Sequence, residues 1–142
     1  MSNEDIGIIF YLLKMCDDIE HYKTEYHNVE MMLHKRSGLN ASLMNLSQIG
    51  EFSGRLSAKL KQRYPDIEWG KIKGLRNVIV HEYFGVDVEQ IREIVENEIP
   101  QFIEQILEIL EDFFKKGIID KDFLTYSLQD FQVIDYRKRF KL

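Results

Sequence analysis

Apolar residues recur along the chain at intervals of three and four positions, the spacing that places side chains on one face of an α-helix. This pattern predicts helices over about residues 2–23, 25–34, 39–63, 68–84 and 87–116. Only two prolines and eight glycines interrupt the 142 residues, which leaves little turn chemistry. The sequence therefore predicts an all-α protein, an antiparallel bundle of four to five helices.

The expected helix ends rest on residues that cap or break helices. Ser2 and Asp5 fit a capping box at the first helix, and Asp87 can cap the last one with Gln90 at the reciprocal position. Pro100 falls inside that last helix and is expected to kink it, because proline lacks the amide donor. The other expected breaks are Ser37-Gly38, Tyr64-Pro65-Asp66 and Gly117. We expect one domain, with the bundle over residues 1–116 and a short extension over 117–142 that packs on the bundle or trails from it.

Composition narrows the class of protein. A content of 44% hydrophobic residues suffices for a buried core, and the single cysteine, Cys16, excludes a disulfide scaffold and a cysteine-based zinc site. No apolar run is long enough to span a membrane, and the N-terminus lacks the basic region of a signal peptide, so a cytoplasmic location is expected.

Charge is distributed unevenly along the chain. The formal net charge of −5 by itself argues against a nucleic-acid partner. Residues 55–76, however, carry seven basic and two acidic side chains, whereas residues 87–112 carry one basic and nine acidic side chains. A basic surface for phosphates and a separate acidic flank for a basic partner are both compatible with this distribution.

The segment from Arg76 to Phe84 carries the candidate chemistry. On a helical projection Tyr83 lies within roughly 20° of Arg76, and the arc between Arg76 and His81 is filled by Val80 and Phe84. An apolar strip with polar residues at its margins, on the side away from the core, indicates a second buried contact, most simply a two-fold dimer. Such a dimer would bring two arginines and two histidines into one cleft.

The sequence around this segment resembles the HepT-like branch of the HEPN superfamily. The resemblance runs from about Ser42 to Leu110 and is carried by Gly74-Leu75-Arg76-Asn77 and by Val80-His81-Glu82-Tyr83-Phe84-Gly85-Val86-Asp87. Members are HEPN-type helical bundles that dimerise through the motif helices and act as metal-independent RNase toxins of type VII toxin–antitoxin pairs. Their partner is a MntA-type nucleotidyltransferase, an antitoxin that attaches AMP to the tyrosine of the motif.

The resemblance implies a role for each motif residue. Arg76 and His81 would be the catalytic pair, Asn77 an accessory active-site residue and Tyr83 the AMPylated residue, with no cofactor and no metal. The residue types suit this chemistry, because a histidine titrates near neutral pH and an arginine can stabilise the negative charge on phosphate while the ribose 2′-hydroxyl attacks it. The rival interpretation is a catalytically inactive HEPN binding subunit that partners a minimal nucleotidyltransferase.

Simpler interpretations remain open for several residues. From the helix pattern alone, Arg76 fits a surface arginine and His81 an interface histidine, and only the resemblance favours catalysis. Glu51 fits a position in the cleft and a solvated position equally well. His27 and His34 lie seven residues apart, but no compact ligand triad accompanies them, so surface positions are favoured over a metal site.

Overall fold

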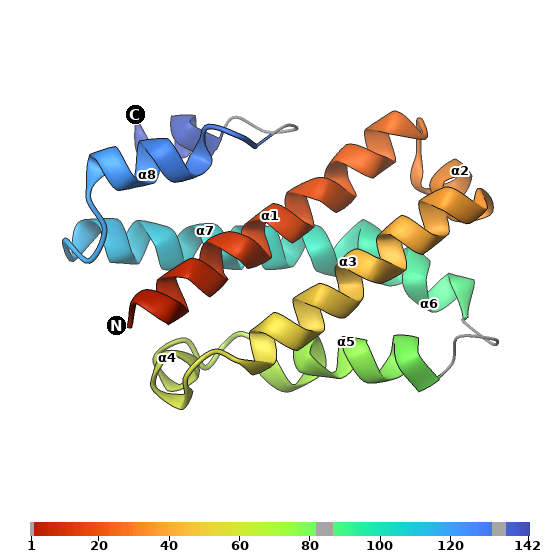
Figure 1. Cartoon of the computed structure of the whole chain (residues 1–142), viewed down its shortest axis with the longest axis horizontal. Coiled ribbons are helices and arrows are strands. Elements are labelled where there is room, and N and C mark those ends of the chain that lie inside the picture. Colours follow the sequence, from red (N-terminus) through yellow and green to blue (C-terminus); the bar gives the residue numbers. More distant parts are fainter. Residues whose placement is uncertain (1, 82–86, 132–135) are drawn as a thin grey trace.

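The structure is a computed structural model that describes residues 2–81, 87–131 and 136–142, and for residues 78–81 it describes the backbone only. Within these ranges the chain is helical and contains no strand, so the predicted all-α class is confirmed (Figure 1). The helices are α1 (Asn3–Glu25), α2 (Val29–His34), α3 (Arg36–Gly54), α4 (Ala58–Arg63), α5 (Trp69–His81), α6 (Val88–Glu93), α7 (Ile99–Lys115) and α8 (Lys121–Leu128). A π-helical segment, Ile94–Glu98, joins α6 to α7, and a 3₁₀ segment, Tyr136–Phe140, lies near the C-terminus.

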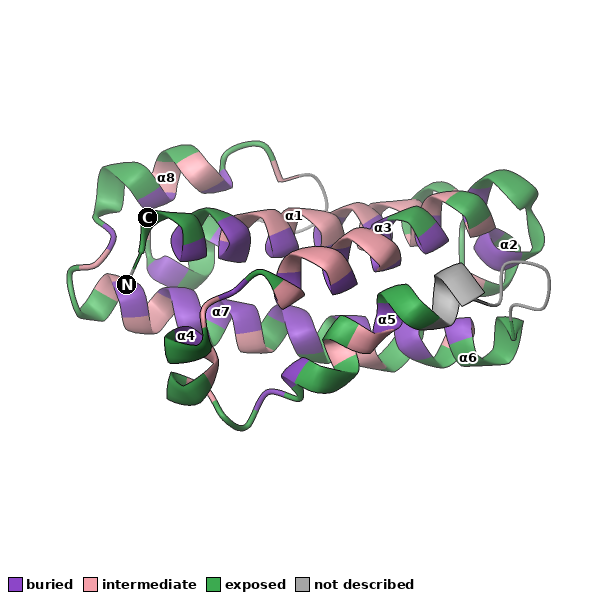
Figure 2. Ribbon diagram, turned by 60° about the horizontal axis from the view of Figure 1, so that its bottom comes forward, coloured by how far each residue is buried: buried purple, intermediate pink, exposed green. Residues whose placement is uncertain are grey.

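The long helices α1, α3 and α7 form the body of the bundle. Helix α3 packs against α1 on one side and α5 on the other, and α7 packs against α1 (Figure 1). Their facing sides are apolar, and the side chains with no exposed surface include Ile9, Leu12, Leu46, Ile106 and Leu110 (Figure 2). Burial of this continuous apolar face is the main force that holds the helices together. Helix α5 lies at the edge of the bundle, so one of its sides is open to solvent.

The prediction of one long helix over residues 39–63 is wrong, because the chain leaves the helical conformation at residues 55–57, between α3 and α4. The cause is the carboxylate of Asp5, which is buried at the start of α1. It accepts hydrogen bonds from the Ser57 amide (2.9 Å) and the Ser57 hydroxyl (2.7 Å), and that hydroxyl accepts one from Leu60 N as the N-cap of α4. Burial acts to raise the pKa of Asp5, but the hydrogen bonds from Ser57 and Ser2 and the N-terminal charge together lower it below its ordinary value.

The expected break at Ser37-Gly38 is also wrong, since both residues lie inside α3. A Cβ atom on Gly38 would stand 2.2 Å from the carbonyl oxygen of Met32, so this glycine permits α2 to cross α3 closely. The turns lie elsewhere. His27 adopts a positive φ of 77° after α1, and Asn28 caps α2, which is shorter than expected.

The signals expected at the start of the first helix and around the last long helix are confirmed. Ser2 at the first helix and Asp87 at α6 both accept amide hydrogen bonds as N-caps. The disturbance expected from Pro100 takes the form of the π-helical segment directly before it, since a wider turn removes the need for the missing amide donor. Gly117 ends α7 with a φ of 71°, and Ile118 N bonds back to the carbonyl of Phe113 at 2.9 Å.

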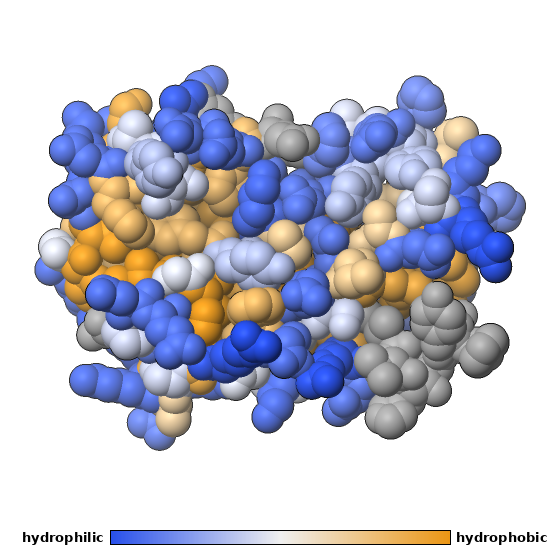
Figure 3. Space-filling model, in the orientation of Figure 1, coloured by the Kyte–Doolittle hydropathy of each residue, from blue (hydrophilic) through white to orange (hydrophobic). Residues whose placement is uncertain are grey.

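The residues after α7 lie against α1 and α7. Leu124 and Leu128 of α8 are buried, and the Tyr136 hydroxyl donates a hydrogen bond of 3.2 Å to the buried carboxylate of Asp17. Arg139 pairs with Glu104 of α7 at 2.6 Å. Apolar surface remains exposed where α8 meets the N-terminal half of α1 (Figure 3). The division into bundle and extension at residue 117 stays a prediction. None of the helices described is long and apolar enough to cross a membrane.

Candidate active site

Helix α5 carries the motif and is anchored at its first residue. The Trp69 indole N–H donates to the carbonyl of Tyr64 at 3.0 Å, and the buried indole ring packs edge-on against Phe102 of α7. Farther along, α5 presses directly on α3. A Cβ atom on Gly50 would lie 2.8 Å from the backbone nitrogen of Arg76, so the backbone at Arg76 is in close contact with α3. The position of Arg76 is therefore set by helix packing.

The Arg76 side chain is 57% exposed and its guanidinium is held by Glu51 of α3. Nη1 of Arg76 donates to Oε2 of Glu51 at 2.5 Å. The other oxygen of Glu51 accepts from Nη2 of Arg55 at 3.2 Å, and the Arg55 guanidinium lies 4.5 Å from the centre of the Phe52 ring. One carboxylate thus orients two guanidinium groups at the solvent-exposed surface. Of the two interpretations open for Glu51, the structure favours a position in the site.

These residues surround a hollow of about 230 Å³ between α3 and α5, which we call the basic groove. The groove is lined by Gly50, Glu51, Gly54, Arg55, Lys73, Arg76 and Asn77. Three of its side chains are cationic and one is a carboxylate, so it is suited to bind an anion. Neither Arg55 nor Lys73 belongs to the site predicted from the motif, although the basic excess over residues 55–76 is a signal for both.

The structure brings together only part of the predicted site. Arg76 and Asn77 are exposed and lie side by side on the basic groove. His81 is the last residue of α5, five positions after Arg76, and its side chain lies outside the described residues. Tyr83 and Phe84 also lie outside the described residues, as does the side chain of Val80. The roles of all four, and the apolar strip, stay predictions.

No group of three or more histidine, cysteine or acidic side chains in the described ranges is arranged to hold a metal ion. His21 lies beside Glu25, with 3.6 Å between Nε2 and Oε2. Cys16 is fully buried in the core, and burial raises the pKa of its thiol far above the ordinary value. Cys16 therefore acts as a packing residue.

Comparison with known proteins identifies the family to which the chain is related. The family described as ribonuclease HepT-like matches residues 12–109, which include all of α5. A "Putative RNase" of Methanocaldococcus jannaschii is 28% identical over 117 residues, 82% of this chain and the whole of that protein. A second "Putative RNase" of the same organism is 30% identical over 113 residues, 79% of this chain and 93% of that protein.

A third relative, the "Probable ribonuclease HepT" of Thermococcus cleftensis, is 30% identical over 82 residues, 58% of this chain and 74% of that protein. No solved structure matches the chain. The family match ends before the residues that follow α7, so α8 and the 3₁₀ segment lie beyond it. Because the matched region covers more than half of the chain and the full-length relatives are named as RNases, the protein belongs to the HepT-like ribonuclease family.

Proposed function

We propose that the protein is a metal-independent endoribonuclease in which Arg76 and His81 form the catalytic pair. The observation that carries this proposal is the exposed Arg76 guanidinium, positioned by Glu51 on an open basic groove. Arginine offers five N–H donors in a planar fork, so one donor can hold Glu51 while others bind a phosphate. Such an arrangement stabilises negative charge that develops on the phosphorus.

The reaction follows from the residue types. A neutral histidine takes the proton of the ribose 2′-hydroxyl, the 2′-oxygen bonds to phosphorus, and the bond from phosphorus to the 5′-oxygen breaks. A protonated histidine supplies the proton that the 5′-oxygen needs as it leaves. The products are a 2′,3′-cyclic phosphate and a 5′-hydroxyl. His81 fits both proton transfers, since its ordinary pKa of about 6.5 lies near neutral pH.

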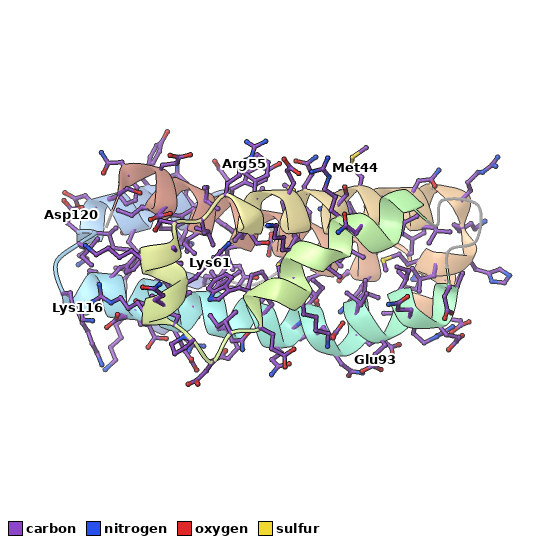
Figure 4. The ribbon with its side chains drawn as sticks, turned by 90° about the horizontal axis from the view of Figure 1, so that it is seen from below. Met44, Arg55, Lys61, Glu93, Lys116 and Asp120 are labelled. Carbon is purple, nitrogen blue, oxygen red and sulfur yellow. The ribbon has the colours of Figure 1, made fainter. Side chains whose placement is uncertain are left out.

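A homodimer would bring together the His81 of each protomer, so that one could accept a proton while the other donates one. We propose that the protein forms such a dimer through α5 and the adjoining side of α3. Met44 supports this choice, because its side chain is 63% exposed. Met44 of α3 and Arg55, the residue directly after α3, are eleven positions apart and project to the same side (Figure 4). An exposed methionine on the side of the helix that lines the basic groove is typical of a surface covered by a partner.

We further propose that the protein is the toxin of a type VII toxin–antitoxin pair and that a MntA-type nucleotidyltransferase inhibits it. In this reaction the Tyr83 oxygen bonds to the α-phosphorus of ATP, pyrophosphate leaves, and the phenolic proton passes to a base. Tyr83 follows Arg76 by seven residues in the sequence, a spacing that equals two turns of an ideal helix. A phosphodiester attached there would compete with RNA for the Arg76 guanidinium. The acidic stretch 87–112 offers a surface for the antitoxin.

Cleavage of a labelled oligoribonucleotide in the presence of a chelator tests the catalytic proposal. The wild type should generate 2′,3′-cyclic phosphate ends, and Arg76→Ala and His81→Ala should each lose at least about a hundredfold in kcat/KM. Lys121→Ala, at the exposed start of α8, is the control and should retain full activity. If the wild type and the two site variants behave alike in cleavage and in growth arrest, the inactive binding subunit becomes the better interpretation.

Treatment with the nucleotidyltransferase and ATP tests the regulatory proposal. The wild type should gain AMP and lose cleavage, whereas Tyr83→Phe should gain no AMP and keep cleaving after the same treatment. Unchanged cleavage by fully modified wild-type protein would refute inhibition by AMP.

A further inference from the structure

Two lysines of α4 and α5, Lys61 and Lys73, have no role in the catalytic proposal. Lys73 lies on α5 one turn before Arg76 and lines the basic groove, and Lys61 of α4 lies on the side of its helix that faces α5 (Figure 4). We propose that Lys73 and Lys61 bind the RNA backbone at phosphates next to the one that is cleaved, so that a single strand runs from Arg76 along α5 toward α4. The proposal rests on the function proposed for Arg76 and assigns the path of its substrate.

The position of the Lys73 side chain is the first support. Its Cγ and Cε atoms lie 3.5 Å from the point that a Cβ on Gly54 would occupy, so the aliphatic stem runs across the bare backbone at the end of α3. A lysine stem that packs on apolar surface leaves its ammonium group free to bind an anion. The stem therefore lies inside the groove and does not extend freely into solvent.

The charges around these lysines are the second support. Partial burial and then the charge of Lys73 lower the pKa of Lys61, so the two ammonium groups are close enough to repel each other. Asp5 acts in the opposite direction, but its carboxylate is engaged by Ser57. No ion pair links Lys61 or Lys73 to a carboxylate of the described residues. A phosphate placed between the two cations would relieve their repulsion.

Two neighbouring cations on the same helices, Lys71 and Arg63, do have carboxylate partners. Lys71, two residues before Lys73 on α5, pairs with Glu98 and lies 3.8 Å from Glu68. Arg63 on α4 lies 3.8 Å from Asp112. Lys61 and Lys73 have no such partner among the described residues, whereas Arg76 and Arg55 of the groove share the carboxylate of Glu51. Lys73 lies in the basic groove with Arg76 and Arg55, and Lys61 extends the positive charge from Lys73 to α4. The matching ligand is therefore a chain of phosphates, because one free phosphate would occupy only part of this surface.

Two double variants with equal loss of charge test the proposal. The groove variant, Lys61→Gln/Lys73→Gln, removes the two lysines of the proposed path. The control variant, Lys59→Gln/Lys71→Gln, removes one lysine from each of the same two helices outside that path. Binding to a fluorescent 2′-O-methyl oligonucleotide, which cannot be cleaved, is measured by anisotropy over a series of salt concentrations. The groove variant should bind roughly tenfold more weakly at low salt, and its plot of log affinity against log salt should be shallower by about 1.4 units, for two lost phosphate contacts. The control variant should retain the wild-type slope.

Cleavage of a dinucleotide by the same proteins separates this proposal from the catalytic one. A dinucleotide has no neighbouring phosphate to bind, so the groove variant should lose much less of its kcat/KM on the dinucleotide than on the long RNA. If the wild type cleaves RNA but both double variants bind the long oligonucleotide equally well, the substrate path is wrong and the catalytic proposal stands. If the groove variant alone binds weakly but the wild type cleaves nothing, the path stands and the catalytic proposal fails. Loss of antitoxin binding by the groove variant, with oligonucleotide binding unchanged, would assign the surface to an acidic protein and overturn the proposal.

Discussion

Replacing Gly50 by alanine should destabilise the fold, although alanine is the better helix former. The added Cβ would stand 2.8 Å from the backbone nitrogen of Arg76 and 3.2 Å from the carbonyl oxygen of Ile72, so α3 and α5 must move apart. Overpacking of this kind costs about 1–3 kcal/mol, and the gain in helix propensity returns about 1 kcal/mol at most. The expected net loss in the free energy of unfolding is about 1 kcal/mol, within a range of roughly 0–2.

Gly74→Ala is the matched control, because Gly74 lies in α5 and a Cβ there meets nothing within 4 Å. That variant should be more stable than the wild type by about 0.5–1 kcal/mol. Urea denaturation followed by circular dichroism measures both, and the difference between them, about 1–3 kcal/mol, isolates the contact between the helices because the propensity gain cancels. Equal stability of Gly50→Ala and Gly74→Ala would refute the close packing of α3 on α5. The Gly50 variant should also lose activity, since the displaced contact is at Arg76.

Three further variants probe contacts described above. Asp5→Asn should lower the free energy of unfolding by about 1.5–3 kcal/mol at neutral pH. Because the pKa of Asp5 is lowered in the folded state, the wild type loses this extra stability as the pH falls below about 4. The urea midpoints of the two proteins should therefore converge at low pH. Tyr136→Phe removes the donor to buried Asp17 and should cost about 1–3 kcal/mol in the same assay, and a variant as stable as the wild type would contradict that hydrogen bond. Glu51→Gln should change stability by less than about 1 kcal/mol, because the Arg76 side chain is 57% exposed, but should lower both KM and kcat of RNA cleavage, since the guanidinium gains freedom for phosphate and loses its orientation. A rise in KM would argue against that role.

Signals that act within one turn of the chain predicted the helix ends well. Ser2, Asp87 and Gly117 each fix their local backbone through hydrogen bonds to residues at most five positions away. The class of the fold followed from apolar spacing, which needs no knowledge of the partner helix.

The errors arose where the deciding contact is with another helix. The break before α4 depends on Asp5, 52 residues away from Ser57, and no local pattern at Ser57 reveals that carboxylate. Gly38 was read as a breaker because its close approach to another helix exists only in the folded chain. For the same reason Glu51 could not be assigned: its guanidinium partner at Arg76 is 25 residues along the chain and on another helix.

The hydrogen bond from Tyr136 to Asp17 joins positions 119 residues apart, close to the full length of the chain. A contact of such long sequence separation closes a very large loop, and because the entropic cost of closure grows with loop length we expect it to form after the local helical pairs. The Tyr136 hydroxyl then fixes the 3₁₀ segment to α1. A variant truncated before residue 136 would leave the buried carboxylate of Asp17 without the Tyr136 hydroxyl.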